Sequence, residues 1–230
     1  MAGWQAALAV VMGLGVAVIL LGGFWDRERR LRAQRARSLP PDRTVPGLPT
    51  DAAPPRYLDH DQALRPPEGA ESLALDPVRR TALRARVAAG TPVPAGLAST
   101  RFVTDPETGW AVADDATVLV CSESVESMRE LLPTLERVLA SGAPLVIVAP
   151  GMRAEVLETL EANQAQRSLR LVVVRADHDP LYRLAELSGA TPLDHSDLQA
   201  GYAPDSAFGA VATWVSTKKE TWVLGASSGT

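Results

Sequence analysis

The apolar and polar positions divide the chain into an apolar N-terminal run, a polar middle stretch and a C-terminal part with globular patterning. In the C-terminal part, short β-branched runs alternate with stretches of helical periodicity, which is typical of parallel strands buried on both faces. Strands are expected at 117–121, 145–148 and 169–174, and a hairpin at 211–215 and 221–224. Helices are expected at 125–141, 153–166 and 180–187. The pattern therefore predicts one α/β domain over residues 91–230.

The N-terminal run, Trp4 to Trp25, contains 22 residues without a charge. As a helix it would be ~33 Å long, which matches a hydrocarbon core of ~30 Å, and tryptophans at both ends fit the aromatic belts of a bilayer. A cleaved signal peptide is the alternative, but no basic segment precedes the run, and the run is too long for such a peptide. We therefore expect residues 1–25 to form an uncleaved transmembrane helix.

Six arginines follow this run and none precedes it; they stand at 27, 29, 30, 32, 35 and 37. The positive-inside rule then predicts a single-pass protein of the cell membrane with its C-terminal domain in the cytoplasm. A nucleic-acid patch would also explain clustered arginines, but beside a membrane span the contact with anionic lipid explains them more simply. Membrane lipid is therefore an expected partner of residues 4–37.

The polar stretch between the run and the globular part is rich in proline, with eight prolines between Ser38 and Leu75. It contains few large apolar residues, so burial cannot offset its conformational entropy, and we expect a flexible linker over residues 26–75. Asp76 can cap a helix that has Pro77 at its first position, which predicts a short helix over residues 76–90.

Composition and motifs exclude several classes of function. The net charge is −4, with acidic and basic residues interspersed in the C-terminal half, which predicts no nucleic-acid partner. The loop after the first strand, 121–127, has no glycine and two acids, so it predicts no bound nucleotide. We expect no cofactor.

Three residues are the candidates for catalysis or metal binding: the single cysteine, Cys121, and two histidines with nearby carboxylates, His178 and His195. A cysteine that ends an apolar strand is usually a small core residue, and these histidines lie in turns beside prolines. The sequence therefore predicts no catalytic residue, no metal site and no enzyme, with a hydrolase or metal enzyme as the less favoured alternative.

Several segments carry a family resemblance: FVTDPETG at 102–109, SMRELLPTLERVLASGAPLVIVA at 127–149, EVLETL at 155–160, AELSGA at 185–190 and the closing hairpin. In order and spacing, residues 96–225 resemble the apical domain of the group I chaperonins, the bacterial sixty-kilodalton heat-shock family. The resemblance implies a swivelling β/β/α fold with an apolar groove that binds peptides. The flanking equatorial domain of that family has no counterpart here, so ATP hydrolysis and ring assembly are not implied.

Carried over from the family, the groove positions fall on Leu97, Arg101, Phe102, Leu132, Leu135, Leu157, Glu161 and Ala162. Leu97 and Arg101 stand where the family has aromatics, and Glu161 and Ala162 where it has valines. Glu155, Glu158 and Glu161 add an acidic stripe to the second helix. The resemblance therefore implies a more polar groove, and the expected ligand is an amphipathic, basic peptide segment or partner protein.

These observations predict a membrane-tethered, ATP-independent module that binds a peptide or protein. The alternative is a structural or adaptor subunit of a membrane complex in which the groove is vestigial.

Overall fold

The computed structural model describes residues 58–225. The helices are α2 (His60–Ala63), α3 (Pro77–Ala89), α4 (Met128–Ser141), α5 (Ala154–Ala165), α6 (His178–Ser188) and α7 (His195–Gln199). The strands are β1 (Gly96–Leu97), β2 (Ala111–Val120), β3 (Leu145–Ala149), β4 (Leu171–Arg175), β5 (Gly209–Ser216) and β6 (Thr221–Val223). Two 3-10 turns complete the described part, η1 (Thr100–Phe102) and η2 (Asp205–Ala207).

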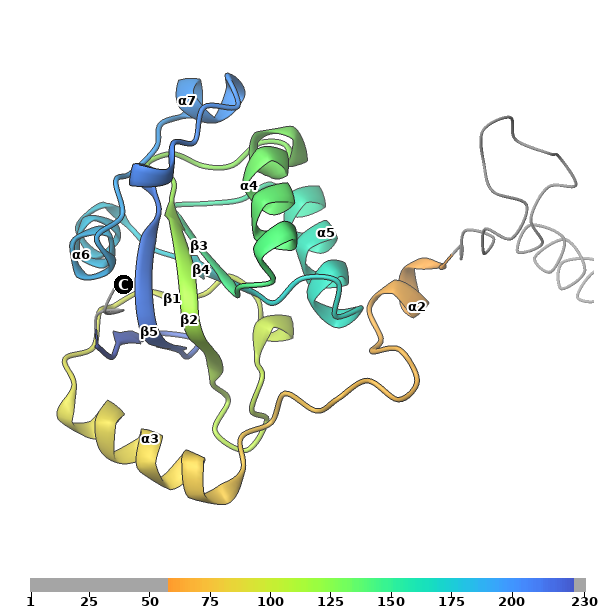
Figure 1. Cartoon of the computed structure of the whole chain (residues 1–230), viewed down its shortest axis with the longest axis vertical. Coiled ribbons are helices and arrows are strands. Elements are labelled where there is room, and N and C mark those ends of the chain that lie inside the picture. The colour runs from red at the N-terminus through yellow and green to blue at the C-terminus, as the bar shows by residue number, and fades with distance from the viewer. Residues whose placement is uncertain (1–57, 226–230) are drawn as a thin grey trace, which may run out of the picture. The chain divides into compact units, whose positions relative to one another are not determined.

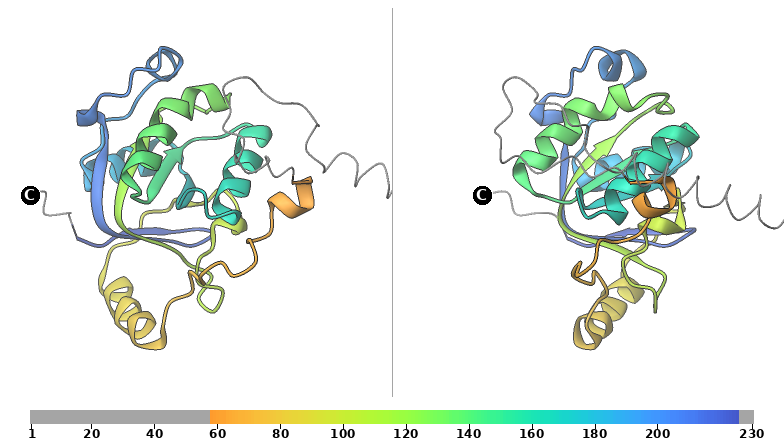
Figure 2. Two further views of the ribbon diagram at one scale, coloured as in Figure 1. Left: turned by 45° about the vertical axis from the view of Figure 1, so that its right-hand side comes forward. Right: turned by 90° about the vertical axis from the view of Figure 1, so that its right-hand side faces the viewer.

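The strands of the described residues form one mixed sheet in the order β1-β4-β3-β2-β5-β6. Strands β2, β3 and β4 are parallel, while β1, β5 and β6 pair antiparallel with their neighbours. Figures 1 and 2 show the two crossover helices, α4 and α5, on one face of the sheet and α6 on the other. Helix α6 leads the chain back across the sheet, so β5 can pair with β2.

Each face of the parallel strands has its own apolar core, because side chains alternate between the faces of a strand. Val118 and Val120 of β2 pack in the cluster that includes Leu181 of α6. Leu119 and Cys121 pack in the opposite cluster, which includes residues of α4 and α5. The runs of β3 and β4 are apolar on both sides because both of their faces are covered.

The sheet curls at its lower end in Figure 1, where β2 bends and α3 lies beside the β5–β6 hairpin. Asp115 has a φ of 47° within β2, a left-handed conformation that aspartate tolerates better than most residues. Helix α3 buries Leu83 in a third cluster with Val215, Trp222 and Leu224. The curl thus provides a separate apolar surface for α3.

Helix α4 forms despite a proline in its interior. The first turn is stabilised by Glu130, whose side chain accepts hydrogen bonds from the Glu126 amide at 3.1 Å and the Ser127 hydroxyl at 3.2 Å. Pro133 cannot donate to the carbonyl four residues earlier. The helix continues because Leu131, Thr134, Leu135 and Val138 lie on one buried face at helical spacing.

The D-P-E-T turn, 105–108, joins the α/β unit to α3 through a buried ion pair. Arg80 donates from Nε and Nη2 to the two carboxylate oxygens of Asp105, at 3.1 and 2.9 Å. Asp105 also accepts from the Thr108 hydroxyl at 2.6 Å, and Arg80 also contacts Glu107 at 2.7 Å and the Leu75 carbonyl at 2.7 Å. The motif is therefore a structural connection between two parts of the fold.

The predicted elements of the α/β domain are present, with shifts of a few residues at their ends. The helix expected at 125–141 begins at Met128, and the strand expected at 117–121 is the second half of the longer β2. The helix expected after Asp76 is α3, and the Asp76 carboxylate accepts from the Arg79 amide at 2.9 Å. In the described part of the predicted linker, 58–75, the carbonyls of Gln62, Ala63 and Arg65 accept hydrogen bonds from the side chain of Gln166, which follows α5. The bounds of the four predicted segments, 1–25, 26–75, 76–90 and 91–230, stay predictions.

The membrane-spanning part of the predicted architecture is corrected by the structure. Among residues 58–225, no helix is long and apolar enough to cross a membrane. The longest of these helices, α4, has 14 residues and is ~21 Å long, well short of a ~30 Å hydrocarbon core. The predicted span Trp4–Trp25 lies outside the described residues. The fold class is therefore mixed α/β with a curled sheet. This finding contradicts the prediction of a single-pass cell-membrane protein with a cytoplasmic C-terminal domain, and that prediction is wrong.

Candidate functional site

Helices α4 and α5 carry most of the residues that the family resemblance selects, and three of these, Leu132, Leu157 and Ala162, are at least partly exposed. Helix α4 exposes two leucines outside its buried stripe, Leu132 at 46% and Leu139 at 62% relative exposure. Leu157 and Ala162 of α5 are half-buried. Apolar side chains of this size could contact an apolar segment of a partner.

Two of the predicted groove residues lie in the core. Phe102 ends the turn η1 and is fully buried, with 0% exposure. Leu135 is on the inner side of α4 and packs in the same cluster. In this conformation neither side chain is available to a ligand, because the sheet and the helices cover both.

The structure brings Arg101 and Glu161 together across the site. Arg101 of η1 is exposed, and its Nε lies 3.3 Å from Oε2 of Glu161, which is buried on α5. Glu161 therefore already has a cationic partner within the chain. The expected role of Glu161 as the partner of a basic ligand would require a ligand to replace Arg101 or to add a second cation.

Glu155, another member of the predicted acidic stripe, pairs with Arg153 at 2.9 Å. Glu158 is exposed on the same helix. Because arginines accompany two of its three carboxylates, the stripe presents less free negative charge than the sequence alone indicates.

A hollow of about 200 Å³ lies at the carboxyl ends of β3 and β4. Ala98, Met152 and Leu157 provide apolar walls, and Arg175 lies at its edge. Leu97, in β1, is half-buried between the two cores of the sheet. The hollow lies between the extended segment after β1 and the start of α5. Of the eight predicted groove residues only Leu157 lines it, so the groove stays a prediction.

The nucleophile and metal candidates lie in surroundings that disfavour chemistry. Burial, with a smaller contribution from the nearby Glu130 carboxylate, raises the pKa of the Cys121 thiol to about 12, so the thiol stays protonated near neutral pH. The His195 Nδ1 lies 3.8 Å from Glu130, while the His178 ring contacts Tyr182 with centroids 4.6 Å apart. Within residues 58–225 no group of three or more His, Cys, Asp or Glu side chains is arranged to hold a metal ion. The predicted absence of catalysis stays a prediction.

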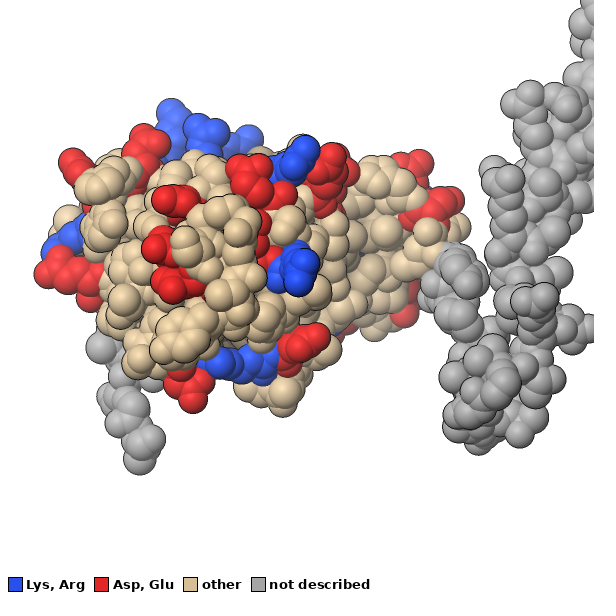
Figure 3. All heavy atoms as spheres, turned by 90° about the horizontal axis from the view of Figure 1, so that it is seen from above, with Lys and Arg blue, Asp and Glu red and all other residues tan. Residues whose placement is uncertain are grey.

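Charge is mixed over the face seen from above in Figure 3. Acidic and basic side chains alternate across it, and apolar or uncharged surface separates them. A nucleic-acid interface generally gathers lysine and arginine into one patch. On this face the distribution favours contact with protein over contact with a phosphate backbone.

Sequence reasoning missed the hollow residues Ala98 and Met152 and the pairing of Arg101 with Glu161. The available signal was that two groove positions, which are apolar in the family, carry opposite charges here. Charges of opposite sign at positions that converge in the fold indicate an ion pair, even though the two residues are far apart in sequence.

Comparisons with known proteins connect part of this chain to the chaperonins. A stretch of 81 residues, 35% of the chain, is 44% identical to chaperonin GroEL 1 of Mycobacterium leprae (strain TN) and spans 15% of that protein. A solved structure, the open state monomer of a group II chaperonin from Methanococcoides burtonii, is similar with a TM-score of 0.42 and 22% identity, over 60% of this chain and 31% of that chain. No protein-family model matches the chain.

The 44% identity over 81 residues confirms the resemblance to the chaperonins for part of the chain. The assignment to group I in particular stays an expectation. Because the chain covers only 15% of the length of the GroEL 1 relative, the activity of that whole protein does not transfer to this chain.

Proposed function

We propose that the α/β unit is a polypeptide-binding domain that uses the face of α4 and α5. The observation that carries this proposal is the 44% identity to a chaperonin over 81 residues. The exposed leucines of α4 and the hollow beside Leu157 support the location. We further propose that binding proceeds without ATP and that the domain catalyses no reaction.

The binding face is tested by replacing Leu132 with serine in the full chain. If Leu132 contacts a client, its loss removes an apolar contact worth ~1.5 kcal/mol or more, so affinity for a reduced, carboxymethylated and therefore unfolded protein should fall about tenfold. Stability should change by less than about 0.5 kcal/mol, because the side chain is half-exposed. Fluorescence anisotropy with the labelled client measures the affinity.

The matched control for this variant is Tyr182→Ser. Tyr182 lies on α6, on the other face of the sheet, and has the same 46% exposure as Leu132. Its replacement should leave client affinity unchanged. Equal affinities for the wild type and the Leu132→Ser variant would reject this face as the binding site.

Nucleotide independence gives a second expected result. Because the loop 121–127 has no glycine that would let backbone amides approach phosphate, client affinity should be the same with and without magnesium and ATP. Calorimetric titration of the full chain with ATP checks direct binding. A micromolar dissociation constant for ATP would overturn this part of the proposal.

A second candidate function is favoured by the Arg101–Glu161 pair and by the burial of Phe102 and Leu135. With these positions occupied by contacts within the chain, the domain would be an adaptor that holds one fixed partner. Copurification of a single stoichiometric protein, together with no affinity for unfolded clients, would favour this adaptor over the client-binding domain.

A further inference from the structure

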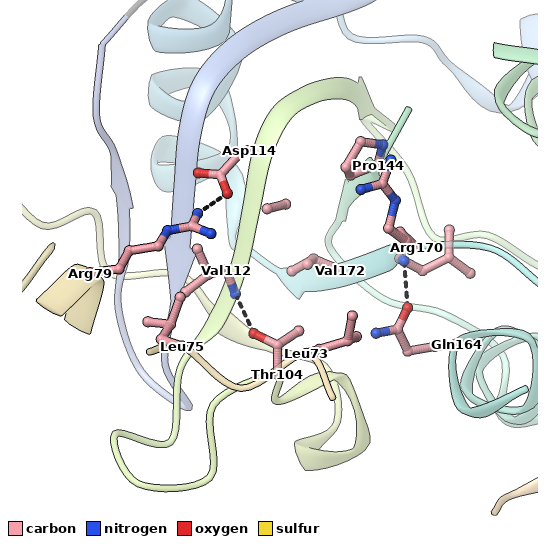
Figure 4. Close-up of a pocket in the computed structure, with 12 residues that line it drawn as sticks. Leu73, Leu75, Arg79, Thr104, Val112, Asp114, Pro144, Gln164, Arg170 and Val172 are labelled. Atoms are coloured by element: carbon pink, nitrogen blue, oxygen red, sulfur yellow. Dashed lines mark hydrogen bonds and ion pairs between the residues drawn. The ribbon is translucent and has the colours of Figure 1, made fainter. Parts of the chain in front are cut away.

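A second concave site lies at the opposite end of the parallel strands from the α5 hollow. Figure 4 shows it between the segment that precedes α3 and the starting ends of the central strands. Its volume is about 160 Å³, and its walls are largely apolar, with Leu73, Leu75, Val112, Pro144 and Val172 among them. A cavity of about 150 Å³ with aliphatic and aromatic walls can hold a benzene-sized molecule, so this pocket fits a group of the size of one large side chain.

Gln164 of α5 supplies a buried polar group to this pocket. The residue is 3% exposed, and its Oε1 accepts a hydrogen bond from the Leu171 amide at 2.7 Å. Because only the oxygen can accept that bond, the orientation of the side-chain amide is fixed. Its Nε2 makes no hydrogen bond to any residue of the described part, and in Figure 4 it points toward Leu73 on the pocket wall. A ligand acceptor in the pocket would supply the hydrogen-bond partner that this amide nitrogen lacks among the described residues.

The charges around the pocket favour an anion. Asp114 forms an ion pair with Arg79 and also accepts from the Thr213 hydroxyl at 3.2 Å, so its charge is balanced. Arg170 also lines the pocket; it donates to the Gly142 carbonyl, and no carboxylate of the described residues lies within 4.0 Å of it. One positive charge without a carboxylate partner among the described residues therefore lies at the exposed rim of the pocket.

We propose that this pocket binds an apolar group of single side-chain size that carries a carboxylate. The apolar part fills the space between Leu73, Val112 and Val172, one carboxylate oxygen accepts from Nε2 of Gln164, and Arg170 balances the charge. The same chemistry is offered by a free short aromatic or branched acid and by the C-terminal carboxylate of a polypeptide that ends in a large apolar residue. The site is separate from the face of α4 and α5 and does not depend on client binding there.

The test is calorimetric titration of the full chain with benzoate and with benzamide, which has the same shape but no charge. Benzoate should bind about tenfold more tightly. The variant Arg170→Gln should lose this tenfold preference and keep its benzamide affinity. The control is Arg84→Gln, an exposed arginine of α3 that lines neither the pocket nor the α5 hollow, and it should bind both compounds like the wild type.

The variant Gln164→Glu tests the donor itself. A glutamate keeps an oxygen for the Leu171 amide but presents a carboxylate to the ligand, so benzoate binding should be lost. Circular dichroism reports whether this variant folds; if it does not, the Arg170→Gln comparison, on an exposed residue, decides alone. The Leu132→Ser variant should bind benzoate like the wild type, so failure of the client-binding proposal is distinguishable from failure here.

A second titration, with peptides, identifies the source of the carboxylate. Acetyl-Gly-Gly-Phe with a free carboxyl end is compared with the same peptide as its amide. Tighter binding of the acid than the amide would support the site and assign it to polypeptide C-termini, whereas binding of benzoate alone would support it and assign it to free acids. Equal binding of benzoate and benzamide, or no binding of benzoate and of either peptide, would overturn the proposal.

Discussion

Replacement of Asp105 by alanine is expected to lower the free energy of unfolding by about 3–5 kcal/mol, because it removes one partner of a buried ion pair. Asp105 is fully buried in the D-P-E-T turn and holds both Nε and Nη2 of Arg80. Without the carboxylate, the guanidinium keeps only the exposed Glu107 as a charged partner, and the Thr108 hydroxyl loses its closer acceptor. Chemical denaturation of the full chain, followed by circular dichroism, measures the change.

Glu107→Ala is the matched control for this variant. Glu107 contacts the same arginine at 2.7 Å, but its side chain is 69% exposed. Exposed ion pairs contribute little, so the control should change stability by less than about 1 kcal/mol. Similar losses in the two variants would mean that the attachment of α3 does not depend on the buried position of Asp105.

The same pair gives the protein a defined sensitivity to acid. The hydrogen bond from Arg80 lowers the pKa of Asp105 below its ordinary value of 3.8, against the opposing effect of burial, and Thr108 lowers it further. A depressed pKa in the folded state contributes stability that is fully present above pH ~4 and is lost as the pH falls through the folded-state pKa. Asp105→Asn should therefore lose the part of the pH dependence that the wild type shows below pH ~4.

The parts of the fold that the sequence predicted are those in which local pattern and burial agree. Strands β3 and β4 are buried along their apolar runs, and the helical spacing of Leu131, Leu135 and Val138 matches the inner side of α4. The predicted helix start at residue 125 lies three residues before the start of α4, because Ser127 and Glu130 set the first turn.

The first half of β2 was not predicted, for a physical reason. Residues 111–116 contain two aspartates and three alanines, which have low strand propensity. The strand forms because β5 pairs with it along its length and because Arg79 pairs with Asp114. Both partners are distant in sequence, so no local window contains the cause.

The candidate site also depends on structure that no local sequence window contains. A family resemblance assigns a residue to a groove but does not give the local backbone conformation that directs its side chain. Here η1 directs Phe102 into the core and leaves Arg101 outside, where it reaches Glu161. The pocket with Gln164 could not be predicted from the sequence either, because its walls come from residues 73–75, β2 and β4. The free donor, Nε2 of Gln164, can be identified only from the hydrogen bond that Oε1 accepts in the folded protein.

Phe102 provides the sharpest test of whether the inherited groove exists in this chain. If the side chain is a core residue, as its complete burial indicates, Phe102→Ala should lower the free energy of unfolding by about 3–5 kcal/mol, the usual range for loss of a buried phenyl ring. Leu132→Ala, at another predicted groove position, should cost less than about 1 kcal/mol, because Leu132 is half-exposed. Denaturant titration of both variants measures the difference.

The client affinity of the Phe102→Ala variant then distinguishes a core role from a binding role of the ring. It is measured without denaturant, at a temperature at which the variant stays folded. A core role predicts that the folded fraction binds clients like the wild type, since the ring is covered by neighbouring residues. A large loss of affinity with little loss of stability would instead mean that η1 opens to expose the ring to clients. In that case the Arg101–Glu161 pair, which joins η1 to α5, would be the contact that holds the groove closed, and Arg101→Gln should raise client affinity.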